Sequence, residues 1–75
     1  MRRPVTLPTI EMFLRITGMG PSRFGRNAIG DARLLIDLRA GRDMTAETAA
    51  RVKQFMLDHV AAERARMVRL NQLVR

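Results

Sequence analysis

Residues 20–42 read GPSRFGRNAIGDARLLIDLRAGR, and they predict two short helices in succession. The first begins at Pro21, because a proline at the first helical position needs no N–H partner, and it ends near Ala28. Gly30 then permits a tight turn, and Asp31 can cap the second helix. Two short helices joined by a tight turn are therefore expected at the centre of the chain.

The flanking segments predict one further helix on each side. On the N-terminal side, Thr9 suits the N-cap position, and apolar residues recur at helical spacing until Gly18 ends the helix. On the C-terminal side, the second central helix ends at Gly41, Thr45 can cap the next helix, and residues 46–75 contain no glycine or proline. We therefore predict an all-α protein, a small four-helix helix-turn-helix domain with a long C-terminal helix.

Three parts are expected along the chain. Residues 1–8 form a basic N-terminal arm that is not expected to be helical, because Pro4 and Pro8 each disfavour helix in the residue before them. Residues 9–58 form the helix-turn-helix domain. Residues 59–75 extend the last helix beyond it.

The last predicted helix is too long for a domain of this size. About 30 helical residues span roughly 45 Å, which exceeds the diameter of so small a globule. Its apolar positions follow a heptad-like spacing interrupted by Glu63, so we expect the extension to pair with a second copy. The expected dimer interface consists of five apolar residues: Val60, Met67, Leu70, Leu73 and Val74. The alternative is a break near Ala61 and Ala62, with the tail folding back on its own core.

Charge narrows the class of partner. The chain of 75 residues has 14 Lys and Arg against 7 Asp and Glu, a formal net charge of +7, and Lys53 is its single lysine. Arginine suits planar, bidentate recognition of phosphates and guanine edges, so a polyanion such as double-stranded DNA is the expected class of partner. The alternative is a solvated basic surface that serves solubility alone.

Composition also excludes several function classes. Without cysteine, the chain can form no disulfide, thiolate zinc site or thiol nucleophile, which indicates a reducing compartment. The apolar stretches are too short for a membrane span or a signal peptide, so we expect a cytoplasmic protein without a membrane contact, and DNA binding would make it nucleoid-associated. His59, near Asp58 and Glu63, falls well short of a zinc site and is expected on the helix surface or in the dimer interface. We therefore expect no enzyme activity, no cofactor and no metal.

Three pairs of residues mark the second and third predicted helices and the loop before the fourth. The pairs are a large and a small residue within the second helix, two apolar anchors on the third, and a loop before the fourth: Phe24 and Gly25, Leu35 and Leu38, Gly41 and Arg42. This pattern resembles the Cro and lambda-repressor-like (XRE) family of transcriptional regulators over about residues 9–57. The turn departs from the family, since Ile29 precedes Gly30 where an apolar residue usually follows the glycine.

The resemblance implies a small DNA-binding transcriptional regulator of bacterial or phage type, a repressor by default. Its third helix would enter the major groove, and a dimer would read a pseudo-palindromic site with half-sites about one turn apart. The expected base contacts lie at the start and on the exposed side of that helix: Ala32, Arg33, Ile36 and Asp37. The expected backbone contacts are polar and cationic residues of the second helix and of the segment ending the third: Ser22, Arg23, Arg26, Asn27, Arg39 and Arg42. Two arginines of the N-terminal arm would enter the adjacent minor groove: Arg2 and Arg3.

Two questions stay open at the sequence level. Asp37 either accepts a hydrogen bond from a cytosine amine or pairs with Arg33 four residues earlier. Ile36 and Ala40 on the exposed side of the third helix suit a protein contact as well as a thymine methyl. The alternative function is therefore a helix-turn-helix scaffold acting as a protein-binding adaptor or transcription cofactor, docked on a larger transcription factor or polymerase subunit.

Overall fold

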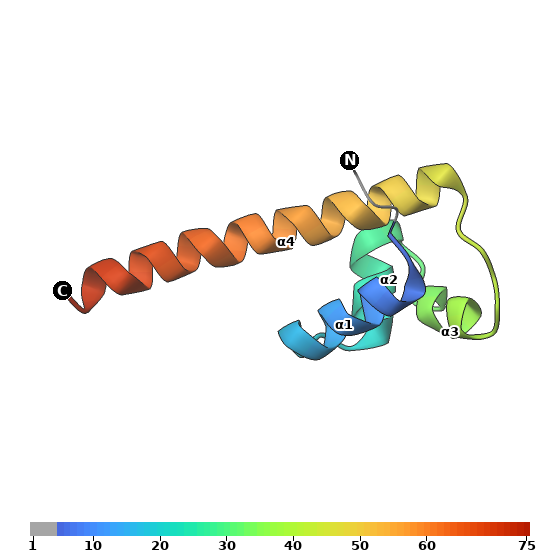
Figure 1. Cartoon of the computed structure of the whole chain (residues 1–75), viewed down its shortest axis with the longest axis horizontal. Helices are drawn as coiled ribbons and strands as arrows, with labels where there is room; N and C mark the ends of the chain where they lie inside the picture. Colours follow the sequence, from blue (N-terminus) through green and yellow to red (C-terminus); the bar gives the residue numbers. More distant parts are fainter. Residues whose placement is uncertain (1–4) are drawn as a thin grey trace.

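A computed structural model describes residues 5–75, which form four helices and, within that range, no strand (Figure 1). In chain order the helices are α1 (Leu7–Thr17), α2 (Pro21–Ile29), α3 (Leu34–Arg39) and α4 (Ala46–Leu73). Figure 1 shows α1, α2 and α3 together beneath the N-terminal half of α4, while the C-terminal half of α4 projects away from them. The predicted all-α class with a long last helix is confirmed.

The core is a single set of buried apolar side chains from all four helices: Ile10, Leu14, Phe24, Leu34, Leu35, Leu38 and Val52. The three phenylalanines, one within this core and two packed against it, join α1, α2 and α4. The Phe24 ring centroid lies 5.7 Å from that of Phe13 and 5.3 Å from that of Phe55, with the rings edge to face in both pairs. Aromatic pairs favour this arrangement because the positive ring edge meets the negative face. The aromatic rings thus pack α1, α2 and α4 together, and the buried leucines of α3 pack that helix on the same core.

The start of α1 differs from the prediction. The helix begins at Leu7 with Thr6 at the N-cap, rather than after Thr9. Pro8 lies in the first turn, where a backbone N–H would have no helical partner, so it does not break the helix. The prediction of a non-helical arm over residues 1–8 is therefore wrong for its last two residues.

The turn between α2 and α3 depends on two glycines with different roles. Gly30 has a φ of 72°, in the left-handed region, and its N–H donates to the carbonyl oxygen of Arg26 at 2.9 Å. Gly25 allows a close approach instead: a Cβ there would lie 2.2 Å from the backbone oxygen of Asp31 and 3.1 Å from the Cβ of Leu34. Gly25 is therefore the point where α2 rests directly on the turn and on the first residue of α3.

The long helix α4 begins where the sequence predicts. The Thr45 side chain accepts a hydrogen bond from the N–H of Thr48 at 3.1 Å, which satisfies one of the free donors at the helix start. The helix then runs without interruption through Ala61 and Ala62 to Leu73. The alternative of a break, with the tail folded back on the core, is wrong.

Candidate nucleic-acid interface

One side of α2 carries four exposed polar side chains. Ser22, Arg23, Arg26 and Asn27 are all exposed, whereas Phe24 on the same helix is buried. At 100° per residue the four positions occupy one arc of about 140°, turned away from the core. We call this set the α2 polar face. It contains all the predicted DNA-backbone contacts of this helix, and within residues 5–75 neither arginine lies in ion-pair distance of a carboxylate.

The outer side of α3 carries the predicted base-contact residues. Ala32 and Arg33 lie in the turn just before the helix, and both are exposed. The Arg33 backbone N–H donates to the Asp31 carboxylate at 2.9 Å, which fixes this turn. Ile36 is 52% exposed, because the leucines of α3 face the core on the opposite side. The Arg33 guanidinium has no ion-pair partner in the described part of the chain, so its charge is available to an anion.

Asp37 contacts a different arginine from the one predicted. Its Oδ2 accepts a hydrogen bond from Nη1 of Arg42 at 2.9 Å, and Arg42 also lies 3.7 Å from Oδ2 of Asp31. The alternative in which Asp37 pairs with Arg33 is therefore wrong: the chain turns after α3 and brings Arg42 back along the helix, next to both carboxylates. Asp37 stays a predicted base contact. Arg42 stays a predicted phosphate contact, but two carboxylates already share its charge.

Arg39 joins α3 to α1. Its Nε and Nη2 donate to the two carboxylate oxygens of Glu11, both at 2.8 Å. This bidentate bond from Arg39 lowers the pKa of Glu11 below its ordinary value, and the same bond raises the pKa of Arg39. Arg39 therefore fixes the position of α3 on the domain. As a predicted phosphate contact it would have to share its guanidinium with Glu11.

The predicted phosphate-contact set thus divides into two groups. The α2 polar face carries cations without carboxylate partners in the described residues, and Arg39 and Arg42 carry cations that carboxylates largely compensate. Sequence spacing could not show this division, because Arg39 and Glu11 are 28 residues apart in the chain.

The predicted dimer-interface residues are all exposed. The exposed fractions are 39% for Val60, 60% for Met67, 53% for Leu70, 78% for Leu73 and 75% for Val74. His59, predicted on the helix surface or in the interface, is instead half-buried against α1, with its ring centroid 5.4 Å from that of Phe13. Contacts between α4 and the rest of the domain therefore continue to His59, and the apolar residues beyond it project into solvent.

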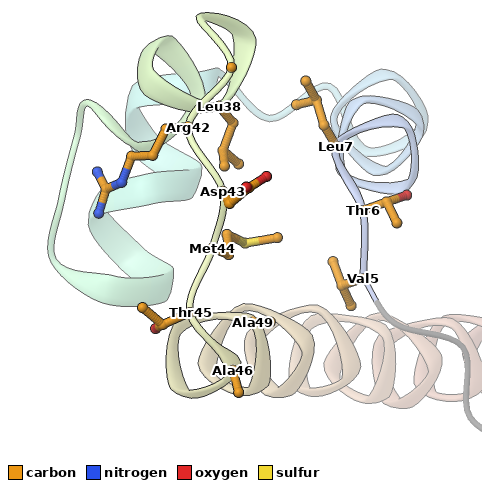
Figure 2. A pocket seen from close by; sticks show the side chains of 11 residues that line it. Val5, Thr6, Leu7, Leu38, Arg42, Asp43, Met44, Thr45, Ala46 and Ala49 are labelled. Carbon is orange, nitrogen blue, oxygen red and sulfur yellow. The ribbon is translucent and has the colours of Figure 1, made fainter.

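A groove that the sequence did not indicate lies between the segment leading into α1 and the loop from α3 to α4 (Figure 2). It has a volume of about 600 Å³, and Figure 2 shows Val5 and Leu7 on one wall with Met44 opposite them. Its charged residues, Arg42 and Asp43, lie on the loop. Arg42 is already held by the carboxylates of Asp31 and Asp37, so the groove offers little to fix a polar ligand.

Three further findings bear on the expectations. Arg2 and Arg3, the predicted minor-groove contacts, lie outside the described residues. Within residues 5–75, no helix is long and apolar enough to cross a membrane, and no group of three or more His, Asp or Glu side chains is placed to hold a metal ion. No family model, curated protein or solved structure matches the chain.

Proposed function

We propose that the chain is a small sequence-specific DNA-binding transcriptional regulator, a repressor by default, that binds a pseudo-palindromic site as a homodimer. In this proposal α3 enters the major groove, and the α2 polar face contacts the DNA backbone. Arg33 contacts a guanine, and Ile36 contacts a thymine methyl. Such a protein would act on the nucleoid in the cytoplasm.

The main support for the proposal is the position of the arginines that have no carboxylate partner. The cations without carboxylate partners in the helix-turn-helix pair, Arg23, Arg26 and Arg33, lie on exposed positions of α2 and of the turn before α3. Phosphate contacts position a DNA-binding protein, and base contacts give it sequence specificity. In this proposal α2 and the turn before α3 therefore supply phosphate and base contacts from adjacent elements.

Arginine variants test the proposal by separating these two kinds of contact. Arg33→Ala should lose about 1–3 kcal/mol of binding and become more tolerant at one base pair of the preferred site. Arg26→Ala should weaken all duplexes alike and reduce the slope of log affinity against log salt by about 1. Arg69→Ala, which removes an exposed arginine at the far end of α4, is the matched control and should change affinity least. Fluorescence anisotropy on preferred and unrelated duplexes measures all three.

Two outcomes would overturn this assignment. If Arg26→Ala and Arg33→Ala cause equal losses on every sequence, Arg33 does not read a base. If Arg69→Ala weakens binding as much as Arg26→Ala does, the attraction comes from total charge, and the α2 polar face has no special role.

A second candidate function rests on the composition of the α3 surface. Ile36 is 52% exposed and Ala40 is exposed beside it, while Arg39 and Arg42 are held by carboxylates. A small apolar surface with compensated charges also suits a protein contact, as in an adaptor docked on a larger transcription factor or polymerase subunit. Replacing Ile36 with Gln separates the two functions: for a DNA reader the variant loses its preference at one base pair and keeps its salt-dependent affinity, whereas for an adaptor neither the wild type nor the variant binds a duplex.

A further inference from the structure

The apolar side of the α4 tail continues the side that packs on the domain. Leu70 follows Val52 by about five full turns, and Val74 follows Met56 by the same interval, so each pair lies on one line along the helix. Val52 is fully buried and Met56 is half-buried against the core, whereas Leu70 and Val74 are 53% and 75% exposed. The apolar stripe is therefore continuous, and its second half extends past the end of the domain.

The C-terminal end of α1 lies at one end of this exposed second half of the stripe. An apolar groove is lined by Ile16 and Thr17 at the end of α1 and by tail residues that include Val60 and Met67. Ile16 is 77% exposed, the least covered apolar side chain of α1. In Figure 1 the C-terminal end of α1 points in the same direction as the tail, beneath it. The exposed half of the stripe and the end of α1 therefore form a notch, with the α4 tail as one wall and the end of the domain as the other.

Sterics decide how a second tail can fill the notch. Packed helices lie about 8–10 Å apart, axis to axis. In a parallel pair, the partner's α4 would have to continue along the same side of this α4 into the space that α1 and α2 already occupy. In an antiparallel pair, the partner's tail enters from the open end and stops where the domain begins. Only the antiparallel arrangement covers the stripe without a collision.

The position of Glu63 favours the same direction. Glu63 lies on the stripe, half-buried, and is held by Arg66 of its own helix at 2.8 Å. A parallel pair would place the two Glu63 carboxylates opposite one another. An antiparallel pair centred on Met67 places Glu63 opposite Asn71 of the partner subunit, an uncharged residue.

We infer that two copies of the chain pair through antiparallel α4 tails, each tail ending in the notch of the other chain. Each chain then contributes Leu70 and Val74 to cover Ile16 and Val60 of the partner subunit. The inference rests on the homodimer of the proposed function and specifies its geometry. With Met67 at the centre, the two copies of Val52 lie about 45 Å apart, since each is separated from the centre by about 22 Å of helix. Figure 1 shows α3 beneath the N-terminal end of α4, on the side of Val52 away from the tail, so the two copies of α3 are at least as far apart along the tails. That distance exceeds the about 34–36 Å between half-sites one turn apart, so the two half-sites are expected more than one turn apart.

Cysteine cross-linking tests the direction of pairing without DNA. The chain contains no cysteine, so Val60→Cys and Val74→Cys each introduce a single thiol at a position outside the core. With a short thiol-reactive cross-linker, a mixture of the two variants, one carrying a size tag, should form a mixed dimer. Either variant alone should give at most a small fraction of that yield, because like positions lie at opposite ends of an antiparallel pair. Cross-linking of Val60→Cys to itself at the yield of the mixed pair would show parallel tails and overturn the inference.

Sedimentation with a matched pair of substitutions tests whether the stripe is the interface. Leu70→Glu should reduce the dimer to monomer, and Leu57→Glu should leave it unchanged, since Leu57 is also 53% exposed but lies about 140° around α4 from Val52. A wild-type chain that sediments as a monomer, or equal effects of both variants, would overturn the inference. Both experiments work without DNA, so their failure is distinct from a failure of DNA binding.

Discussion

The two halves of α4 share one apolar periodicity and differ in what covers it. Up to His59 the apolar side lies on the domain, with Val52 fully buried, whereas Leu70, in line with Val52, is 53% exposed. Helical spacing thus identifies the apolar side of a helix and does not identify the partner of that side. The first half is stabilised by burial within one chain, and the second can be covered only by another molecule.

The largest expected effect comes from the same substitution made at two positions that lie in line along α4. Val52→Asp should lower the free energy of unfolding by on the order of 4 kcal/mol, because it places an unpaired charge in the core. Leu70→Asp should change it by less than about 0.5 kcal/mol in the monomer, because the side chain stays in water. Urea unfolding followed by circular dichroism, at dilutions where the chain is monomeric, measures both. Equal destabilisation by the two variants would mean that the tail packs on its own domain.

A smaller effect is expected where α2 rests on the turn. Gly25→Ala places a methyl group 2.2 Å from the backbone oxygen of Asp31, which cannot move without shifting α3, and should cost about 1–3 kcal/mol. Gly20→Ser is the control, because its Cβ meets no atom within 4 Å and serine suits an N-cap. Thermal unfolding compares the two, and an unchanged melting temperature for Gly25→Ala would show that the close approach does not hold the helix pair.

The smallest effect concerns the pair between α3 and α1. Because Arg39 lowers the pKa of Glu11, the pair contributes stability above the ordinary pKa of about 4.5, and this contribution is lost as the pH falls below that value. Glu11→Gln should therefore be slightly less stable than the wild type at neutral pH and equal to it in acid. Asp43→Asn, at an exposed position without an ion pair in the described residues, is the control. A constant difference between Glu11→Gln and the wild type across this range would contradict the role of the pair.

Local signals in the sequence predicted much of the fold. Gly18 and Gly30 end the first two helices, and Thr45 caps the last, because each acts on the backbone beside it. The same locality explains the error at Pro8, since a proline that disfavours helix before it also fits a first helical turn.

The candidate site depends on contacts that local signals do not determine. Glu11 meets Arg39 only because α1 packs beside α3, and Arg42 reaches Asp37 only because the chain reverses after α3. These two contacts separate the compensated arginines from those of the α2 polar face. Gly25 is different: the sequence identified the large and small pair with Phe24, and the structure supplies its physical reason in the close approach to the turn.

Selection of random duplex DNA by the purified chain, at about 0.15 M salt, tests the proposed function most directly. We predict enrichment of an inverted repeat whose half-sites lie more than one helical turn apart, with an affinity that falls as salt rises. Salt-sensitive binding without an enriched sequence, or no binding at all, would contradict sequence reading by α3.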